Sequence, residues 1–149
     1  MKPGFSLILG CLLSFLPLLA NAGQDEEAIT KVVQLFVDCG DQQDTELADQ
    51  ALHSESKQFI PGDHFKNGLF VITKEKYLSL LRIKKIGGVK RGVKIHSIDI
   101  DTQNKNAVAK IELTSDRMLF YQFIGLSKIK DEGWKIVSVL TSTVVPQKN

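Results

Sequence analysis

The sequence predicts an α+β domain, with helices in its N-terminal half packed on one face of an antiparallel β-sheet. Two observations support this class. Apolar residues recur with helical spacing before Gly87-Gly88, and after this pair four segments rich in β-branched and aromatic residues follow, separated by turn-type residues. Helices first and a strand meander afterwards are typical of an α+β fold.

The first 22 residues predict a secretory signal peptide. Lys2 precedes an almost wholly apolar run over 5–20, and small residues stand at Ala20 and Ala22. We expect cleavage after Ala22 and a mature chain of residues 23–149, exported to the periplasm or secreted. A membrane anchor is the alternative, but the run is shorter than the roughly 20 residues that span a bilayer, and Pro17 interrupts it.

A lipoprotein site at Gly10-Cys11 is a second alternative, which the apolar sequence beyond Cys11 disfavours. Cleavage leaves 127 of the 149 residues, an ordinary size for one domain, with 18 Lys/Arg against 17 Asp/Glu. That balance gives no case for nucleic acid binding, and the mature chain has no second stretch that would cross a membrane. Cys39 is then its only cysteine, so no internal disulfide forms.

The N-terminal half predicts three helices. The first begins near the acidic residues 25–27, presents Ile29, Val32, Val33, Phe36 and Val37 on one face, and stops near Gly40. Asp44 is expected to cap a second, shorter helix, and Thr73 a third one that ends before Gly87. Residues 53–68 are interpreted as a loop, and 69–72 as a short strand.

Four strands are predicted after the helices. They cover residues 93–100, 107–114, 118–129 and 134–143. The segment DTQNKN between the first two resembles a calcium loop only superficially, because Lys110 stands where an EF-hand needs glutamate. We therefore predict a hairpin turn there, and we expect no metal and no cofactor.

Asp99 lies within the first of these strands and is a candidate site residue. Strand alternation places it with Val93, Ile95 and Ser97, opposite to His96, Ile98 and Ile100. An inward Asp99 would be a buried carboxylate with a raised pKa, suited to acid–base chemistry. A solvated aspartate at the strand end is the simpler alternative.

Several segments together resemble the nuclear transport factor 2-like superfamily. They are His53 in LHS, the strand pair IHSIDI and AVAKIEL, and the run LSKIKDEGWKIV. The resemblance is strongest to the SnoaL-like branch, which includes proteins described as lumazine-binding, and it covers nearly all of 25–143. It implies a curved antiparallel sheet wrapped around three helices as a cone, with a pocket at the open end.

The fold hosts enzymes, small-molecule binders and dimer modules, so it does not fix the activity. Relatives in this branch often carry an acidic residue where this chain has Gln122, and Asn-Lys where it has Ser138-Val139. Both differences remove charge from the sheet. They favour a neutral, hydrogen-bonding pocket over acid–base catalysis.

Three further polar residues are candidate ligand contacts. His53 follows the second helix, where it lines a cavity mouth or bonds the helix's last carbonyls. Tyr121 and Gln122 point to opposite faces of their strand, so at most one of them faces a given cavity. We expect the Tyr121 ring in the core and Gln122, if buried, hydrogen-bonded or in contact with a ligand.

The stretch 82–94 is basic but lacks aromatic residues, which disfavours binding of single-stranded nucleic acid. We interpret it as a solvated loop. Three hypotheses for function follow. The first is an exported, non-catalytic protein that binds a small molecule in an apolar pocket. The second is an isomerase- or dehydratase-like enzyme with His53 or Asp99 as base and Tyr121 or Gln122 polarising a carbonyl. The third is a homodimeric interaction module.

Overall fold

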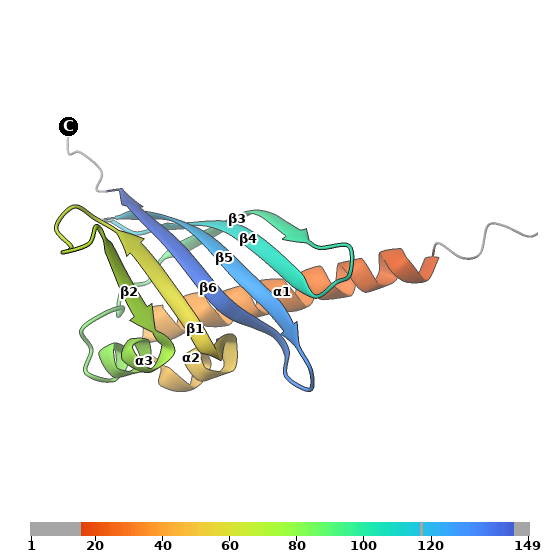
Figure 1. Cartoon of the computed structure of the whole chain (residues 1–149), viewed down its shortest axis with the longest axis horizontal. Helices are drawn as coiled ribbons and strands as arrows, with labels where there is room; N and C mark the ends of the chain where they lie inside the picture. Colours follow the sequence, from red (N-terminus) through yellow and green to blue (C-terminus); the bar gives the residue numbers. More distant parts are fainter. Residues whose placement is uncertain (1–15, 117, 145–149) are drawn as a thin grey trace, which may run out of the picture.

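The computed structural model describes residues 16–116 and 118–144, with side chains from Gly23 onward (Figure 1). Within these residues three helices precede or interrupt six strands, which confirms the α+β class. In chain order the elements are α1 Leu16–Gln42, α2 Thr45–Ala51, β1 Leu52–Pro61, β2 Leu69–Thr73, α3 Lys74–Arg82, β3 Gly92–Ile100, β4 Asn106–Thr114, β5 Leu119–Ile129 and β6 Gly133–Val144.

The six strands form one sheet in the order β2-β1-β6-β5-β4-β3. The predicted meander is present, since β3 to β6 pair antiparallel in succession. The sheet is mixed rather than antiparallel, however, because β1 pairs parallel to β6. After the β1–β2 hairpin the chain passes through α3 to β3, at the far edge of the sheet. The meander then runs back across the sheet, and its last strand, β6, lies beside β1 and parallel to it.

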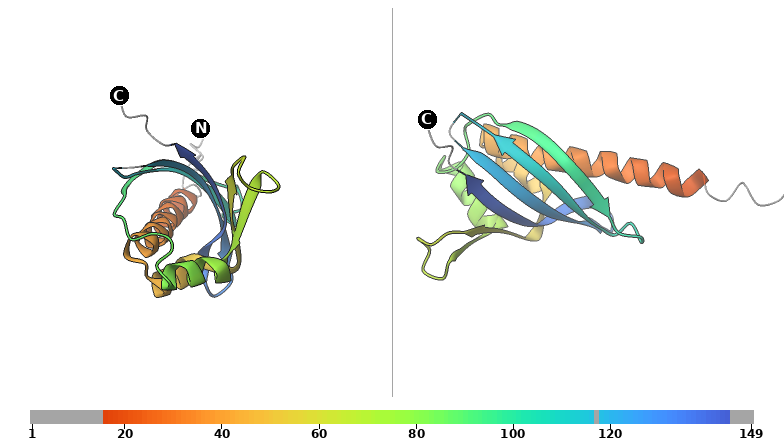
Figure 2. Two further views of the ribbon diagram at one scale, coloured as in Figure 1. Left: turned by 90° about the vertical axis from the view of Figure 1, so that its left-hand side faces the viewer. Right: turned by 90° about the horizontal axis from the view of Figure 1, so that it is seen from above.

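The sheet curves around α1, as the end-on view in Figure 2 shows. Irregular pairing supplies part of this curvature, because a β-bulge bends and twists its strand. The register shifts between Ile95 and Ser97 in β3, between Gly125 and Leu126 in β5, and between Leu52 and Lys57 in β1. The concave face packs against the apolar stripe of α1, where Ile29, Val33, Phe36 and Val37 are buried as predicted.

Both predicted helix caps are confirmed. The Asp44 carboxylate accepts hydrogen bonds from the Glu46 and Leu47 backbone N–H groups, and the Thr73 hydroxyl accepts one from Lys76. The first helix is longer than predicted at both ends. It begins at Leu16, so that the acidic residues 25–27 lie inside it, and it passes Gly40 to end at Gln42.

The prediction of a loop over 53–68 is wrong for its first part, which forms β1. The sequence pattern does not indicate this strand, because its buried positions include the polar residues Ser56 and Gln58. Apolar and polar residues therefore do not alternate along it. The hairpin turn DTQNKN is confirmed. The Asp101 carboxylate accepts hydrogen bonds from the backbone N–H groups of residues 103, 105 and 106, and Asn104 has a positive φ of 53°.

No helix among the described residues is long and apolar enough to cross a membrane. Residues 1–15 of the predicted signal peptide lie outside the described part of the chain, and the expected cleavage point after Ala22 falls within α1.

Candidate functional site

A cavity of about 290 Å³ lies between the concave face of the sheet and the C-terminal end of α1. We refer to it as the chamber. One side is closed by α3 and by the basic loop, residues 83–91, which connects α3 to β3. Most of its wall is apolar. The apolar side chains come from α1, β1, β2, the basic loop and β5, and they are Phe36, Ile60, Ile72, Ile86 and Phe120.

Three polar side chains stand together on the sheet side of the chamber. Gln58, Thr141 and Gln122 come from the neighbouring strands β1, β6 and β5, and each is 6% exposed. Gln122 Nε2 donates a hydrogen bond to the Thr141 hydroxyl over 3.1 Å. Gln122 Oε1 and Gln58 Nε2 find no hydrogen-bond partner among the described residues. Because buried polar groups are nearly always paired, these two atoms are the most unusual feature of the chamber.

Strand alternation explains why these three residues meet. Gln122 shares its face with the buried Ile124, and Thr141 shares its face with Val139. Gln122 lies directly opposite Thr141 in the β5–β6 ladder. Gln58 lies opposite Val139 in the parallel ladder between β1 and β6. A third buried polar atom without a partner in the described chain, Ser56 Oγ, belongs to the same face of β1 but does not line the chamber.

Arg91 lines the chamber from the basic loop and is fixed to α1. Its Nε donates to Asp41 Oδ1 over 2.6 Å, its backbone N–H donates to Asp41 Oδ2, and a terminal guanidinium nitrogen donates to the Val37 carbonyl over 3.0 Å. Both side chains of the ion pair are less than 20% exposed. The positive charge of Arg91 is therefore neutralised where it meets the chamber. The expectation of a solvated loop is wrong for this residue.

Gly87 and Gly88 let the basic loop approach the end of α1. The Gly88 N–H donates to the Gly40 carbonyl over 2.9 Å, and Gln43 Nε2 donates to the Ile86 carbonyl over 2.9 Å. Gly87 has a φ of +74°, and a Cβ at this position would collide with the Gly40 carbonyl oxygen. Only glycine adopts this positive φ and fits against the Gly40 carbonyl without strain. The hydrogen bonds of Gly88 to Gly40 and of Gln43 to Ile86 then hold the basic loop against the end of α1, which closes this side of the chamber.

Two ionisable side chains next to the chamber stay protonated. Burial raises the pKa of the Cys39 thiol to about 11, and it raises the pKa of the Tyr77 hydroxyl well above its ordinary value. The thiol donates to the Phe36 carbonyl over 3.0 Å, and its sulfur lies 3.7 Å from the Tyr77 oxygen. A protonated, fully buried thiol is a poor nucleophile, and Cys39 therefore acts as a packing residue.

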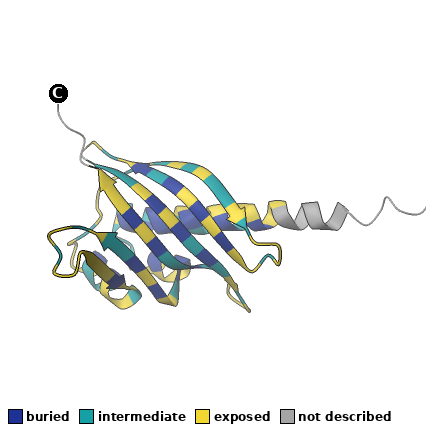
Figure 3. Cartoon of the chain, turned by 45° about the horizontal axis from the view of Figure 1, so that its top comes forward, coloured by how far each residue is buried: buried dark blue, intermediate teal, exposed yellow. Residues whose placement is uncertain are grey.

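The structure brings one of the four sequence-predicted site residues into the chamber, and this residue is Gln122. Tyr121 lies on the opposite, outer face of the sheet and is 36% exposed, so its predicted place in the core is wrong. The outward position follows from alternation, because the neighbouring Gln122 points inward. Figure 3 shows this alternation as bands of buried and exposed residues along the strands.

Asp99 and His53 lie outside the chamber. Asp99 is exposed and accepts a hydrogen bond from the Ser97 hydroxyl over 3.1 Å. The register shift at His96 moves Asp99 from the face of Val93 and Ile95 to the outer one. His53 is the second residue of β1, and its Nδ1 accepts a hydrogen bond from the Glu55 N–H. No base among the four candidates therefore meets Gln122 in one cavity.

The sequence interpretation missed Gln58, Thr141, Tyr77 and Arg91 as chamber residues. Gln58 falls in the segment 53–68, which the sequence predicts as a loop. One signal is present in the sequence. Gln122 interrupts the apolar series Phe120, Ile124 and Leu126 on one face of its predicted strand, and an amide in such a position needs a hydrogen-bond partner if it is buried.

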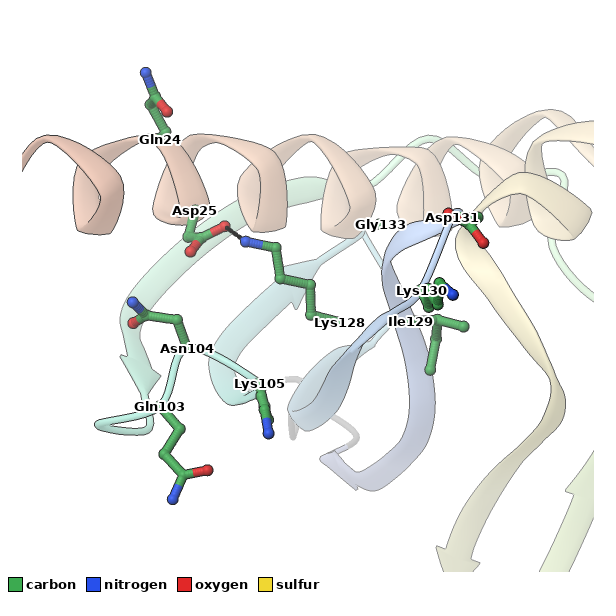
Figure 4. A pocket seen from close by; sticks show the side chains of 10 residues that line it. All are labelled: Gln24, Asp25, Gln103, Asn104, Lys105, Lys128, Ile129, Lys130, Asp131 and Gly133. Atoms are coloured by element: carbon green, nitrogen blue, oxygen red, sulfur yellow. Dashed lines mark hydrogen bonds and ion pairs between the residues drawn. The ribbon is translucent and has the colours of Figure 1, made fainter. Parts of the chain in front are cut away.

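A second, larger cavity of about 700 Å³ lies at the opposite end of the molecule (Figure 4). It is bordered by α1, the β3–β4 turn and the β5–β6 turn, with Gln24, Asp25, Asn104, Lys128 and Asp131 among its lining residues. Its buried carboxylate already has partners, because Asp25 Oδ1 accepts hydrogen bonds from Lys128 Nζ (2.6 Å) and Trp134 Nε1 (2.9 Å).

Burial raises the pKa of Asp25, but the hydrogen bonds from Lys128 and Trp134 and the charge of Lys128 outweigh burial and hold this pKa below its ordinary value. Asp25 thus fastens α1 to β5 and β6. Among the described residues no cluster of three or more histidine, cysteine, aspartate or glutamate side chains is arranged to hold a metal ion. The chamber is therefore the better candidate site.

Solved structures with this fold show the same architecture. A nuclear transport factor 2-like protein of unknown function from Shewanella baltica superposes with a TM-score of 0.70 at 21% identity, covering 83% of this chain and 96% of that one. One from Silicibacter pomeroyi gives a TM-score of 0.69 at 15% identity, covering 83% and 98%. A cystatin-like fold protein from Burkholderia xenovorans gives 0.61 at 16% identity, covering 83% and 95%. At these identities the likeness shows the fold alone.

The family model described as "Putative lumazine-binding" matches residues 24–140. The chain belongs to this family. No curated protein matches the chain significantly. Membership confirms the resemblance noted in the sequence and places the chain in the nuclear transport factor 2-like superfamily. The match covers α1 from Gln24 and the strands up to Leu140, so it includes all chamber residues except Thr141.

Proposed function

We propose that the chain is an exported protein that binds a small, uncharged molecule in the chamber and performs no chemistry on it. One observation carries the proposal. An apolar cavity of about 290 Å³ holds buried amide atoms that have no partner in the described chain. Small-molecule sites combine apolar walls with a few placed polar groups, and the volume of about 290 Å³ lies just below their usual range of roughly 300–1,000 Å³. Membership of a family described as lumazine-binding supports a small-molecule ligand.

The lining of the chamber supports binding without catalysis. Of the described residues that line it, none is an aspartate, glutamate or histidine. The carboxylate of Asp41, which pairs with the lining residue Arg91, already accepts two hydrogen bonds from it. General acid–base catalysis needs a titrating group within hydrogen-bond reach of the substrate. Tyr77 has a raised pKa and remains a neutral donor.

Export rests on residues 1–22, with their basic start, apolar run and small residues at Ala20 and Ala22. Its test is N-terminal sequencing of the protein recovered from the periplasm or the medium. The expected first residue is Gly23. A full-length chain retained in the cytoplasm would overturn this part of the proposal.

Native mass spectrometry of the mature chain, residues 23–149, tests the binding function. The expected result is a reproducible adduct of a small molecule that disappears on denaturation. Ile60 lines the chamber, so Ile60→Trp should fill the cavity with the larger side chain and abolish the adduct. Val108→Trp is the matched control, because Val108 is 45% exposed on β4 and lies outside the chamber. An adduct that survives Ile60→Trp, or the lack of any adduct, would overturn the proposal.

The outer face of the sheet favours homodimerisation as a second function. Tyr121, Phe123 and Leu140 are 36%, 45% and 51% exposed on the adjacent strands β5 and β6, and Phe123 lies directly opposite Leu140. Neighbouring apolar side chains of this size on a sheet often mark an interface between proteins. Sedimentation of the mature chain should show a dimer that Phe123→Glu dissociates. A monomer at high concentration would contradict this function and would leave ligand binding unaffected.

A further inference from the structure

The two chamber glutamines offer complementary hydrogen-bonding atoms. Gln58 Nε2 is a free donor and Gln122 Oε1 is a free acceptor among the described residues, and both side chains are buried. A molecule that satisfies both atoms must present one acceptor and one donor. Rotation of both amides by 180° exchanges the two roles, and the same molecule still satisfies them.

The positions of the two glutamines indicate how these atoms are spaced. Gln58 lies opposite Val139 of β6, and Gln122 lies opposite Thr141 on the other side of β6. With strands about 4.8 Å apart and a rise of about 3.3 Å per residue, the two Cα atoms are roughly 12 Å apart. The two amides therefore enter the chamber at separate points on its sheet side, one on either side of β6. This arrangement fits a group whose acceptor and donor are separate atoms better than it fits a single hydroxyl oxygen.

The electrostatics of the chamber select against a charged ligand. The guanidinium of Arg91 is paired with the Asp41 carboxylate at 2.6 Å, and the Tyr77 hydroxyl is neutral. A charged group entering this space would lose its hydration without gaining an unpaired counter-ion. An uncharged polar group avoids that cost.

We propose that the ligand is an uncharged molecule with an apolar body and a carboxamide or lactam edge. Its carbonyl oxygen accepts a hydrogen bond from Gln58 Nε2, and its N–H donates to Gln122 Oε1. The apolar body packs against Phe36, Ile72 and Phe120. This inference rests on the proposed function and adds the chemical class of the ligand to it.

Equilibrium dialysis of the mature chain with five naphthalene probes tests the proposal. The probes share one apolar body and differ in the polar group. 2-Naphthamide carries the donor and the acceptor, methyl 2-naphthoate lacks the donor, 2-naphthol offers one oxygen, 2-naphthoate is charged, and naphthalene has no polar group. We expect the amide to bind at least tenfold more tightly than every other probe, because a site built to hydrogen-bond its ligand rejects analogues that leave its groups unpaired.

Matched variants connect this preference to the two glutamines. Gln58→Met and Gln122→Met keep the size of the side chain and remove the amide, so each should reduce the amide preference to less than threefold while naphthalene binding persists. Gln50→Met is the control, because Gln50 is exposed on α2 and lies outside the chamber. It should keep the full preference.

The outcomes separate the ligand class from the binding function. Equal binding of all probes, tighter binding of 2-naphthoate, or an amide preference that survives both methionine variants would overturn the ligand class and leave the chamber as a binding site. If no probe binds, the ligand class is tested by identifying the molecule that the mature chain carries in native mass spectrometry. A carboxamide or lactam supports the inference, and any other polar group overturns it. No probe binding and no carried molecule would overturn the proposed function as well.

Discussion

Replacement of Gln58 by methionine should stabilise the mature chain in the absence of ligand. Gln58 is buried on β1, and its Nε2 has no partner among the described residues. If this atom binds a ligand, it stays unpaired in the ligand-free protein, and the unpaired buried atom lowers the free energy of unfolding. Methionine has about the same length and flexibility, and it places no polar atom in the apolar chamber.

The expected change in the free energy of unfolding depends on the unpaired atom and on the hydrogen bond that each substitution removes. A buried polar atom left unpaired costs about 1–3 kcal/mol, so Gln58→Met should raise the free energy of unfolding by about 1 kcal/mol or more. Gln122→Met removes a similar cost but also the hydrogen bond to Thr141, which contributes about 0.5–1.5 kcal/mol. We therefore expect Gln122→Met to be nearly neutral and Gln58→Met to be the more stable of the two.

Urea unfolding of residues 23–149 measures this difference, and thermal unfolding should show a rise of about 3–5 °C for each kcal/mol in a chain of this length. The exposed Gln50→Met is the control and should stay within about 0.5 kcal/mol of the native chain. A loss of more than about 1 kcal/mol in Gln58→Met would refute the reasoning, because the amide would then be a structural group with a satisfied partner.

Three further outcomes follow from the packing around the chamber and at the opposite end. Asp25→Asn should be less stable than the native chain at pH 7, and the difference in the free energy of unfolding should shrink below about pH 4. The reason is that a carboxylate with a lowered pKa stabilises the fold only while it is ionised. A difference that stays constant down to pH 2 in urea unfolding would contradict this. Cys39, with its pKa near 11, should react with a thiol reagent at pH 8 only after addition of urea; rapid reaction of the folded protein would contradict its burial. Gly87→Ala should destabilise the chain by about 1–3 kcal/mol in the same assay, because its positive φ and the nearby Gly40 carbonyl both oppose a Cβ; an unchanged stability would contradict the described closure of the chamber.

Local chemistry explains which parts of the fold the sequence could predict. The caps at Asp44 and Thr73, the apolar stripe of α1 and the turn at Asp101 depend on nearby residues, and all are confirmed. The strand β1 was missed because its buried face is polar. One of the polar residues on that face, Gln58, lines the chamber, so the apolar pattern fails at a residue of the candidate site.

The site itself depends on register, which a single sequence specifies weakly. Asp99 changes face because one residue of β3, at His96, bulges out of the ladder, and alternation alone does not reveal this shift. Gln122 could be identified as a polar interruption of an apolar face. Its partnership with Thr141 and Gln58 requires the order β1-β6-β5, in which strands distant in the sequence become neighbours.

The most direct test is the two-dimensional ¹H–¹⁵N spectrum of the mature chain, with its backbone N–H and glutamine side-chain NH₂ signals, during titration with 2-naphthamide. We expect the side-chain NH₂ signals of Gln58 and Gln122 to shift together and saturate, while that of the exposed Gln50 stays in place. Shifts confined to residues of the outer sheet face, such as Phe123 and Leu140, with Gln58 and Gln122 unmoved, would contradict the assignment of the chamber as the binding site.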